Sequence, residues 1–293
     1  MFLLGIVWGA SFICIKVSLQ TFGPWTTAFV RVLIGGLALS VIGWLVGQGL
    51  NKIPNRKAWA FAFTIGTFNI AKPLTLLSWG QQYVSSAFAG VSMGAVPLMV
   101  VPLVFLFSSN EIIDLKRICG LIIGFMGLII LFDFNPSIQN FDKNQALGQL
   151  TCLLATACYA GGSILTRMAP PMPPISFATA TLISAALVLF PIAILIEGLP
   201  RTFSLESGSA LLFLAIFSTA IGAVIRVHVT TTAGPVFMSL TSYQVPIWAV
   251  IYSSIFTQEA LPPKLLIALA IILVGIGLTE HRSLKKILKT YLT

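Results

Sequence analysis

Charged side chains are scarce in this chain of 293 residues. Lys, Arg, Asp and Glu together make up 9% of it, and only eight residues are acidic. A soluble globular domain carries about 25% charged residues, so this chain lacks the side chains needed to cover a water-facing surface. Hydrophobic residues make up 57% of it, and the mean hydropathy is +0.98. This composition excludes a soluble domain and places most of the chain in lipid.

The residue patterns of metal sites and of catalysis are also missing. The four cysteines (Cys14, Cys119, Cys152, Cys158) lie in apolar runs without metal-ligand spacing, so we expect buried small side chains rather than disulfides. There is no HExxH motif, no pair of carboxylates inside an apolar segment, and no Ser/His or Asp/Asp arrangement at catalytic spacing. We therefore predict no metal, no cofactor and no enzymatic activity.

Ten apolar segments follow one another along the chain, and a membrane-spanning helix needs about 20 such residues. They cover approximately residues 2–19, 25–47, 58–79, 84–107, 115–132, 146–167, 176–196, 208–231, 235–256 and 261–279. Backbone groups in lipid must be hydrogen-bonded within their own segment, which predicts helices. The alternating polarity of a membrane barrel is absent. The predicted fold is an all-α membrane protein with ten transmembrane helices.

The basic residues predict the orientation of these segments. With ten crossings, the side of the N-terminus collects Lys52, Arg56, Lys57, Lys116, Arg117, Arg167, Arg282, Lys285, Lys286 and Lys289, against Lys143, Arg201 and Lys264 on the other side. Loops rich in Lys and Arg stay in the cytoplasm, so both termini are predicted to be cytoplasmic in a cell (inner) membrane. The net charge of +9 then reflects topology rather than a nucleic-acid partner.

The chain repeats itself after about half its length. Glu111 and Glu259, Lys116 and Lys264, and Gly127 and Gly275 each lie 148 residues apart, and Pro97 and Pro246 lie 149 apart. A duplication in so apolar a chain is typical of a transporter built from two related halves. Because each half holds an odd number of segments, five, the second half enters the membrane inverted relative to the first.

These observations divide the chain into four parts. The first repeat covers residues 1–132, and the polar stretch 133–145 connects it to the second repeat at 146–280. Residues 281–293 form a basic tail that we expect in the cytoplasm. GxxxG pairs such as Gly120 and Gly124 predict close helix contacts. They do not decide between a monomer and a homodimer.

Several motifs resemble those of the drug/metabolite transporter superfamily, and within it the EamA-type proteins. The matching residues are Trp8-Gly9-Ala10-Ser11-Phe12, Lys16, Arg31, Pro97 and Glu111 in the first half, and Tyr159, Arg167, Pro246 and Glu259 in the second. The resemblance covers essentially the whole chain. It implies alternating access around a cavity built mainly from the first, third, fourth, sixth, eighth and ninth segments. One departure is Leu182, which stands near where the first half has Arg31.

Positive charges inside the apolar segments are the main candidates for a binding site. Lys72 and Arg226 are expected to flank the middle of the membrane, with His228 beside Arg226. No Asp or Glu lies deep in any segment, so these cations need carbonyls, water, lipid phosphate or a bound anion as partners. Lys16 and Arg31 lie nearer a membrane surface and are expected to extend towards it in a structural role.

Polar, aromatic and sulfur-containing side chains complete the predicted substrate site. They are Trp8, Asn69, Tyr83, Met93, Tyr159, Ser239, Tyr243 and Gln244. Asn69 and Lys72 are three residues apart and are therefore predicted to share one helix face. Lipid contact for the aromatic residues, and hydrogen bonds within their own helix for the hydroxyl groups, are the alternatives.

Two prolines and two glutamates have predicted structural effects. Pro97 and Pro246 remove a backbone donor and clash with the preceding turn, so each should kink its helix near the centre of the membrane and can act as a hinge. Glu111 and Glu259 precede the last helix of each half. Negative charge is favourable at a helix N-terminus, so we expect a structural role for both.

The sequence thus predicts a secondary transporter, an exporter or an exchanger, of small organic metabolites that are amino-acid-like or carry a carboxylate. The partners it implies are a small-molecule substrate and the lipid bilayer. A cargo that carries phosphate, such as a nucleotide sugar or sugar phosphate, is the alternative, since cations also bind phosphate. A channel or a membrane enzyme is the alternative from another class. Without deep carboxylates, the usual proton carriers, coupling to protons is doubtful.

Overall fold

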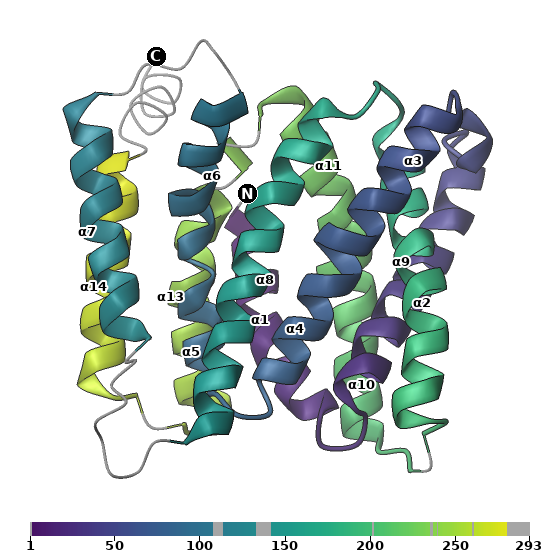
Figure 1. Ribbon diagram of the computed structural model, residues 1–293. Helices are drawn as coiled ribbons and strands as arrows, with labels where there is room; N and C mark the ends of the chain where they lie inside the picture. The colour runs from purple at the N-terminus through teal and green to yellow at the C-terminus, as the bar shows by residue number, and fades with distance from the viewer. Residues whose placement is uncertain are drawn as a thin grey trace.

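The structure is a computed structural model, and it describes residues 2–107, 114–132, 142–200, 202–234, 237–238, 240–259 and 261–279. All regular secondary structure in these ranges is helical. Figure 1 shows the helices running roughly parallel to one another across the bundle, with their ends gathered at two opposite faces. The prediction of an all-α protein is confirmed.

The helices of the first half run from the N-terminus to the middle of the chain. They are α1 (Phe2–Ser18), α2 (Pro24–Leu45), η1 (Leu50–Lys52), α3 (Arg56–Ile65), η2 (Gly66–Ala71), α4 (Lys72–Gly80), α5 (Ser86–Ser92), α6 (Ala95–Phe107) and α7 (Leu115–Leu131). Those of the second half are α8 (Lys143–Met168), α9 (Pro174–Glu197), α10 (Leu205–Phe213), η3 (Leu214–Ile221), α11 (Gly222–Thr232), η4 (Leu240–Tyr243), α13 (Gln244–Tyr252), η5 (Ser253–Thr257) and α14 (Pro263–Thr279).

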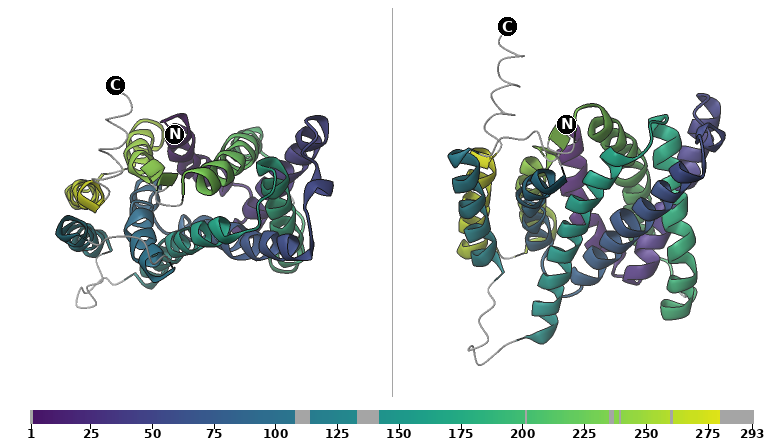
Figure 2. Two further views of the ribbon diagram at one scale, coloured as in Figure 1. Left: turned by 90° about the horizontal axis from the view of Figure 1, so that it is seen from above. Right: turned by 45° about the horizontal axis from the view of Figure 1, so that its top comes forward.

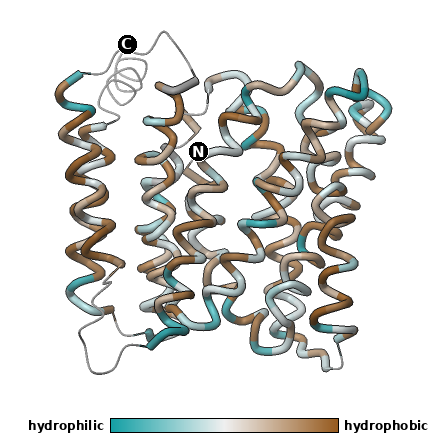
Figure 3. Tube along the Cα trace, viewed as in Figure 1, coloured by the Kyte–Doolittle hydropathy of each residue, from teal (hydrophilic) through white to brown (hydrophobic). Residues whose placement is uncertain are grey.

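Six helical stretches in the described part of the chain are long and apolar enough to cross a bilayer. They are Pro24–Leu45, Arg56–Gly80, Ser86–Phe105, Lys143–Met168, Pro174–Glu197 and Leu205–Thr232, accompanied by the shorter apolar helices Phe2–Ser18, Gln244–Thr257 and Pro263–Thr279. Figure 3 shows hydrophobic residues along the lengths of the helices and hydrophilic residues mostly near their ends. This distribution suits a lipid environment, and the chain is a multi-pass membrane protein.

Two of the long helices contain a π-helical segment at equivalent positions. η2 interrupts the stretch between α3 and α4, and η3 interrupts the stretch between α10 and α11. η2 begins at Gly66 and η3 at Leu214, which is 148 residues later and repeats the offset between Glu111 and Glu259. π-helical segments within α-helices occur frequently at functional sites. Both segments contribute residues to the cavity described below.

Pro97 and Pro246 each lie shortly after a break in their helix. α5 ends at Ser92 and α6 begins at Ala95, so Pro97 stands in the first turn of α6. Pro246 stands in the first turn of α13, directly after the η4 turn. A proline in the first turn of a helix removes a backbone N–H that would have no partner within the helix, so both prolines fit a helix that starts just before them.

Glycines allow α7 and α14 to pack closely. Figures 1 and 2 show these two helices side by side at one edge of the bundle. A Cβ atom added at Gly275 would lie 2.4 Å from the Cα and N atoms of Gly124 and 2.8 Å from the carbonyl oxygen of Gly120. The GxxxG pair Gly120 and Gly124 therefore serves a contact within the chain.

We expect Gly275→Leu to destabilise the protein. The added side chain meets backbone atoms of α7, which cannot rotate away, and overpacking of this kind costs about 1–3 kcal/mol or more. Thermal unfolding of the detergent-purified protein should show a melting temperature several degrees below that of the unmodified chain. Gly277→Leu is the matched control, because a Cβ atom there has no neighbour within 4 Å. Equal melting temperatures for the two variants would contradict this packing.

Candidate functional site

A cavity of about 160 Å³ lies between helices from both halves of the chain. That volume exceeds the space of a single water molecule about tenfold, which suits a small organic molecule. Its wall includes residues of α1, of η2 with α4, of α8, and of η3 with α11, together with Met93, Val96 and Val245. These belong to the segments that the family resemblance implies. α2 and α9 add Arg31 and Leu182.

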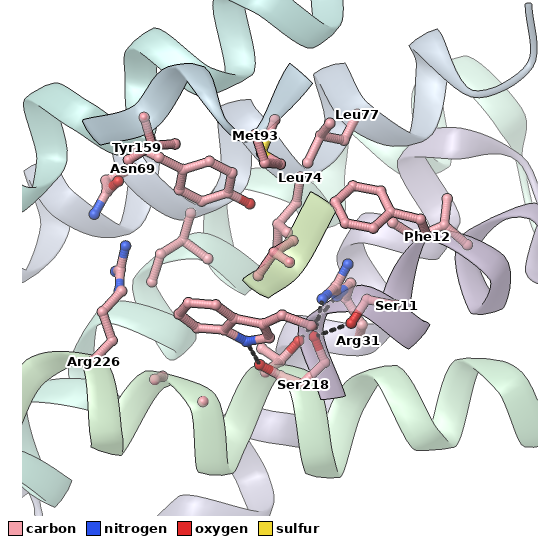
Figure 4. Close-up of a pocket in the computed structure, with 18 of the residues that line it drawn as sticks. Ser11, Phe12, Arg31, Asn69, Leu74, Leu77, Met93, Tyr159, Ser218 and Arg226 are labelled. Carbon is pink, nitrogen blue, oxygen red and sulfur yellow. Dashed lines mark hydrogen bonds between the residues drawn. The ribbon is translucent and has the colours of Figure 1, made fainter. Parts of the chain in front are cut away.

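Arg31 stands at one end of the cavity and is only 4% exposed. Its Nε donates to Thr219 Oγ1 at 2.9 Å, and its Nη2 donates to Ser218 Oγ at 3.2 Å. Both hydroxyl groups belong to the π-helical segment η3. Ser11 Oγ donates to Ser218 Oγ at 2.7 Å and joins α1 to this cluster, which Figure 4 shows. Hydroxyl oxygens thus hold the guanidinium group in place without neutralising its charge.

Arg226 stands at the other end, on α11, and is held by Asn69 of η2. The hydrogen-bond network places the amide oxygen of Asn69 opposite Arg226, the reverse of the orientation drawn in Figure 4. In that orientation the oxygen accepts from Nη1 at 2.8 Å and from Nη2 at 3.0 Å, while the amide nitrogen donates to the carbonyl oxygen of Cys158 at 3.1 Å. Asn69 is fully buried, so its position is closely constrained.

The space between the two arginines has mainly aromatic and aliphatic walls. Trp8 of α1 donates from Nε1 to the carbonyl oxygen of Ser218 at 3.0 Å, which fixes its ring against η3. Tyr159 and Met93 face the cavity from the side opposite Arg226 and Ser218 in Figure 4. Gly222 lies so near the indole that a Cβ atom would be 2.7 Å from Trp8 Nε1. The site thus combines a cation at each end with an apolar middle.

The cavity wall contains no carboxylate among the described residues that line it. The hydrogen bonds of Arg31 go to hydroxyl groups and those of Arg226 to an amide. Each guanidinium carries five N–H donors, of which at most two are used in this way. Two positive charges with unused donors favour an anion between them.

Five of the predicted substrate residues line this cavity and five do not. Trp8, Asn69, Met93, Tyr159 and Arg226 line it. Lys72, Tyr83, His228, Tyr243 and Gln244 are absent from its wall. Ser239 lies outside the described residues. The five residues that line the cavity were predicted from charged, amide, aromatic and sulfur-containing side chains inside apolar segments.

The predicted pairing of Lys72 with Arg226 across the cavity is wrong. Lys72 is exposed and lines a separate, apolar groove beside Trp25 and Trp79 on the outside of the bundle. His228 is exposed as well, because a residue two positions after Arg226 points to the opposite side of the helix. Neither side chain faces the cavity.

The remaining three residues have other surroundings. Tyr83 is 39% exposed and packs against Trp79, with ring centroids 4.9 Å apart, at the end of α4. Gln244 lies against Gly5 of α1, where a Cβ atom on the glycine would be 2.7 Å from its Cβ. Tyr243 packs against a core cluster of residues from both halves. These contacts support packing between helices.

The prediction that Arg31 extends to the membrane surface is also wrong, because it is buried and bonded to η3. Sequence reasoning missed the partners Ser11, Ser218 and Thr219. Ser11 follows Trp8 by three residues, and residues three positions apart on an α-helix lie on the same face. That spacing was the available signal for Ser11, whereas its bond to Ser218 joins positions 207 residues apart and the bond of Arg31 to Thr219 joins positions 188 apart.

Two charged side chains outside the cavity, Lys16 and Glu197, form hydrogen bonds to backbone groups at helix ends. Lys16 Nζ donates to the carbonyl oxygens of Gln81 at 3.1 Å and Val84 at 3.4 Å, which lie just after the last turn of α4. This position suits a cation, because carbonyl groups are unpaired at a helix C-terminus. Glu197 accepts from the backbone N–H groups of Trp25 at 2.9 Å and Thr26 at 2.8 Å, at the start of α2.

Glu259 holds a helix N-terminus, but not the one that its position in the sequence suggested. Its carboxylate accepts from the backbone N–H of Ser86 at 2.9 Å and of Ala87 at 3.5 Å, and from the hydroxyl group of Ser253. It therefore serves α5 rather than α14, the helix that follows it. Glu111, its counterpart in the first half, lies outside the described residues.

We expect Glu259→Ala to lower the melting temperature by a few degrees. The substitution leaves N–H groups of α5 without an acceptor, and charge-assisted hydrogen bonds contribute about 1.5–3 kcal/mol. Differential scanning fluorimetry of the purified variant measures the change. Glu206→Ala is the control, since Glu206 is exposed in the first turn of α10 and should cost less. A larger loss in the control would exclude this role for Glu259.

Known proteins resemble this chain over nearly its whole length. The model of the EamA-like transporter family matches residues 1–133 and 146–280. The chain is 25% identical over 281 residues to Protein PecM of Dickeya dadantii, covering 95% of this chain and 90% of that protein. It is 25% identical over 282 residues to the inner membrane transporter YedA of Escherichia coli K12, covering 95% and 88%. A solved crystal structure shares the fold, with a TM-score of 0.70 at 18% identity, covering 94% of this chain and 95% of that one.

Proposed function

As this chain belongs to the EamA-like transporter family, we propose that it is a secondary transporter that carries small organic metabolites bearing a carboxylate across a membrane by alternating access. It acts as an exporter or an exchanger. The single observation that carries this proposal is the pair Arg31 and Arg226, two guanidinium groups that face one cavity between the halves and that pair with no carboxylate among the described residues. Membership of a transporter family points away from an enzyme.

We place ten transmembrane helices in two inverted repeats of five. Three observations support this arrangement: the constant offset of 148 residues between matching residues, the π-helical segments η2 and η3 at that same offset, and the two segments that the family model matches. The repeats cover residues 1–132 and 146–280, joined by 133–145. Both termini, including the basic tail 281–293, lie in the cytoplasm, because the Lys and Arg residues gather on that side. Similarity to an inner membrane transporter supports the cell inner membrane.

Movement between the inward-open and outward-open forms takes place at the two proline breaks. Pro97 and Pro246 each follow a break between two short helical segments, and each break adjoins a residue of the cavity wall, Met93 or Val245. Breaks of this kind in both halves are typical of secondary transporters whose repeats rock against each other. The rest of each helix then moves as a rigid unit.

The substrate lies between the arginines. Its carboxylate supplies the negative charge that the described cavity wall lacks. A guanidinium group binds a carboxylate through two parallel hydrogen bonds, and a low-dielectric cavity strengthens the attraction. The described cavity wall has no carboxylate to carry a proton, which supports exchange or facilitated transport rather than proton coupling. A phosphate-bearing cargo is the second candidate, because the fork of an arginine suits phosphate as well.

Counterflow in proteoliposomes tests the proposed function. Vesicles are loaded with an unlabelled mixture of carboxylates, amino acids or sugar phosphates, and uptake of a labelled member of each class is followed. We expect protein-dependent accumulation for at least one carboxylate, with competition by free phosphate only if the cargo is a phosphate ester. The absence of protein-dependent flux for every class, or ionic currents far above transporter turnover, would exclude the proposal.

A further inference from the structure

One helical stretch, η3 followed by α11, fixes the positions of both arginines of the cavity, although Arg31 itself belongs to α2. Arg31 is bonded to Ser218 and Thr219 of η3, and Arg226 follows Thr219 by seven residues on α11. At 1.5 Å per residue, the two anchoring points are separated by about 10 Å along the helix axis. Figure 4 shows the two side chains at opposite ends of the cavity. With the two guanidinium groups at opposite ends of the cavity, a carboxylate bound to one of them leaves the other without an anion.

Each guanidinium group keeps donors for a ligand of its own. Arg31 uses Nε and one N–H of Nη2, and Arg226 uses one N–H of Nη1 and one of Nη2. Three N–H donors remain on each side chain. Within the described part of the chain, no other protein group accepts from them, so two separate anion-binding ends face the same cavity.

The cavity offers no partner of negative charge for an ammonium group. Its described lining holds no Asp or Glu, and every charge on it is positive. An amino acid would bring its ammonium group to within a few ångströms of a guanidinium group in a site of low dielectric, where like charges repel strongly. The aromatic rings of Trp8 and Tyr159 compensate only in part, since cation–π contacts are weaker than a paired carboxylate.

From this arrangement we infer that the substrate is a short linear organic dianion without an ammonium group. One anionic end binds Arg31 and the other binds Arg226, while the carbon chain between them packs on Trp8 and Met93. The anionic ends are two carboxylates, or a carboxylate and a phosphoryl group, which share the same hydrogen-bonding pattern. This inference rests on the proposed function and narrows its substrate class.

A matched set of small acids tests the inference on the purified full chain. Succinate, glutarate, adipate and pimelate vary the distance between two carboxylates. Valerate replaces one carboxylate of glutarate by a methyl group, glutamate adds an ammonium group to glutarate, and 3-phosphonopropionate replaces one carboxylate of succinate by a phosphonate. Dissociation constants are measured by thermal shift titration, and the same compounds compete in the counterflow assay.

We expect one intermediate chain length to bind best, and glutarate or its best homologue to bind at least about tenfold more tightly than valerate or glutamate. Arg31→Gln and Arg226→Gln should each remove the preference of dicarboxylate over monocarboxylate. This ratio is measured within one variant and so does not depend on its stability. Lys72→Gln, a change of cation outside the cavity, should keep the preference.

The outcomes separate this inference from the proposed function. If valerate or glutamate is bound and transported as well as glutarate, the dianion inference is overturned and the transporter proposal stands. If neither arginine variant changes the ratio, the two-ended site is likewise overturned. Preference for 3-phosphonopropionate over every dicarboxylate supports a phosphoryl group at one end. If no carboxylate is transported at all, the proposed function itself has failed.

Discussion

Arg226→Gln is expected to reduce protein-dependent transport roughly 10- to 100-fold. Glutamine keeps much of the length of the side chain but removes the charge, and a hydrogen bond to a charged group contributes about 1.5–3 kcal/mol. The loss should appear in the initial rate of counterflow in proteoliposomes at a fixed protein-to-lipid ratio. It should lower the melting temperature without ligand by a few degrees at most, because Asn69 is the one hydrogen-bond partner of the guanidinium group within the described residues.

His228→Gln is the matched control for this prediction. His228 lies on the same helix, two residues further along, and its side chain is exposed outside the cavity. Its replacement should leave the transport rate within about twofold of the unmodified chain, since exposed substitutions away from a site have small effects. Equal losses in the two variants would show that transport is sensitive to substitution anywhere on α11, and not specifically to the cavity arginine.

Gly162→Ala should lower the transport rate almost as much as Arg226→Gln, although it adds only one methyl group. A Cβ atom at Gly162 would lie 1.8 Å from Cγ of Asn69 and 2.1 Å from its Oδ1, so the asparagine must move away. Asn69 positions Arg226. A binding group that is displaced from its productive position lowers the rate of transport, as it lowers the rate of an enzyme. We expect at least an approximately tenfold lower transport rate, measured by counterflow.

The neighbouring glycine provides a close control for this second prediction. A Cβ atom at Gly161 meets nothing within 4 Å, so Gly161→Ala should transport normally. Both variants add the same group to the same helix, and helix propensity changes in the same direction for both. Normal transport by Gly162→Ala would mean that the contact between Asn69 and Arg226 is not needed.

The general architecture was predictable because lipid imposes simple rules. Apolar length indicates helices, and the constant offset of residues such as Glu111 and Glu259 indicates a duplication. Trp8 and Tyr159 were predicted as cavity residues from their aromatic side chains, and both line the cavity. Arg226 was identified from its depth in an acid-free segment. In these cases local pattern and final position agree.

The positions of Lys72 and Arg31 were not predictable from the pattern alone. Asn69 and Lys72 share a face only on a regular α-helix, whereas η2 includes Asn69 and ends immediately before Lys72. A π-helical segment turns less per residue, so it rotates the residues that follow and directs Lys72 outward. Arg31 was assigned to the membrane surface by depth, but its partners come from η3 in the other half. The spacing of residues within one segment does not show which residues of a distant segment they contact.

Access to the cavity from both sides of the membrane tests the central claim most directly. Ser163 lines the cavity, and the unmodified chain has four free cysteines. A Ser163→Cys variant in which these four are replaced by alanine is reconstituted in one orientation, and a membrane-impermeant thiol reagent is added to either face during exchange. We predict that the introduced thiol is modified from both faces in separate reactions, and more slowly when a transported carboxylate is present. Modification from one face only, under every condition, would contradict alternating access through this cavity.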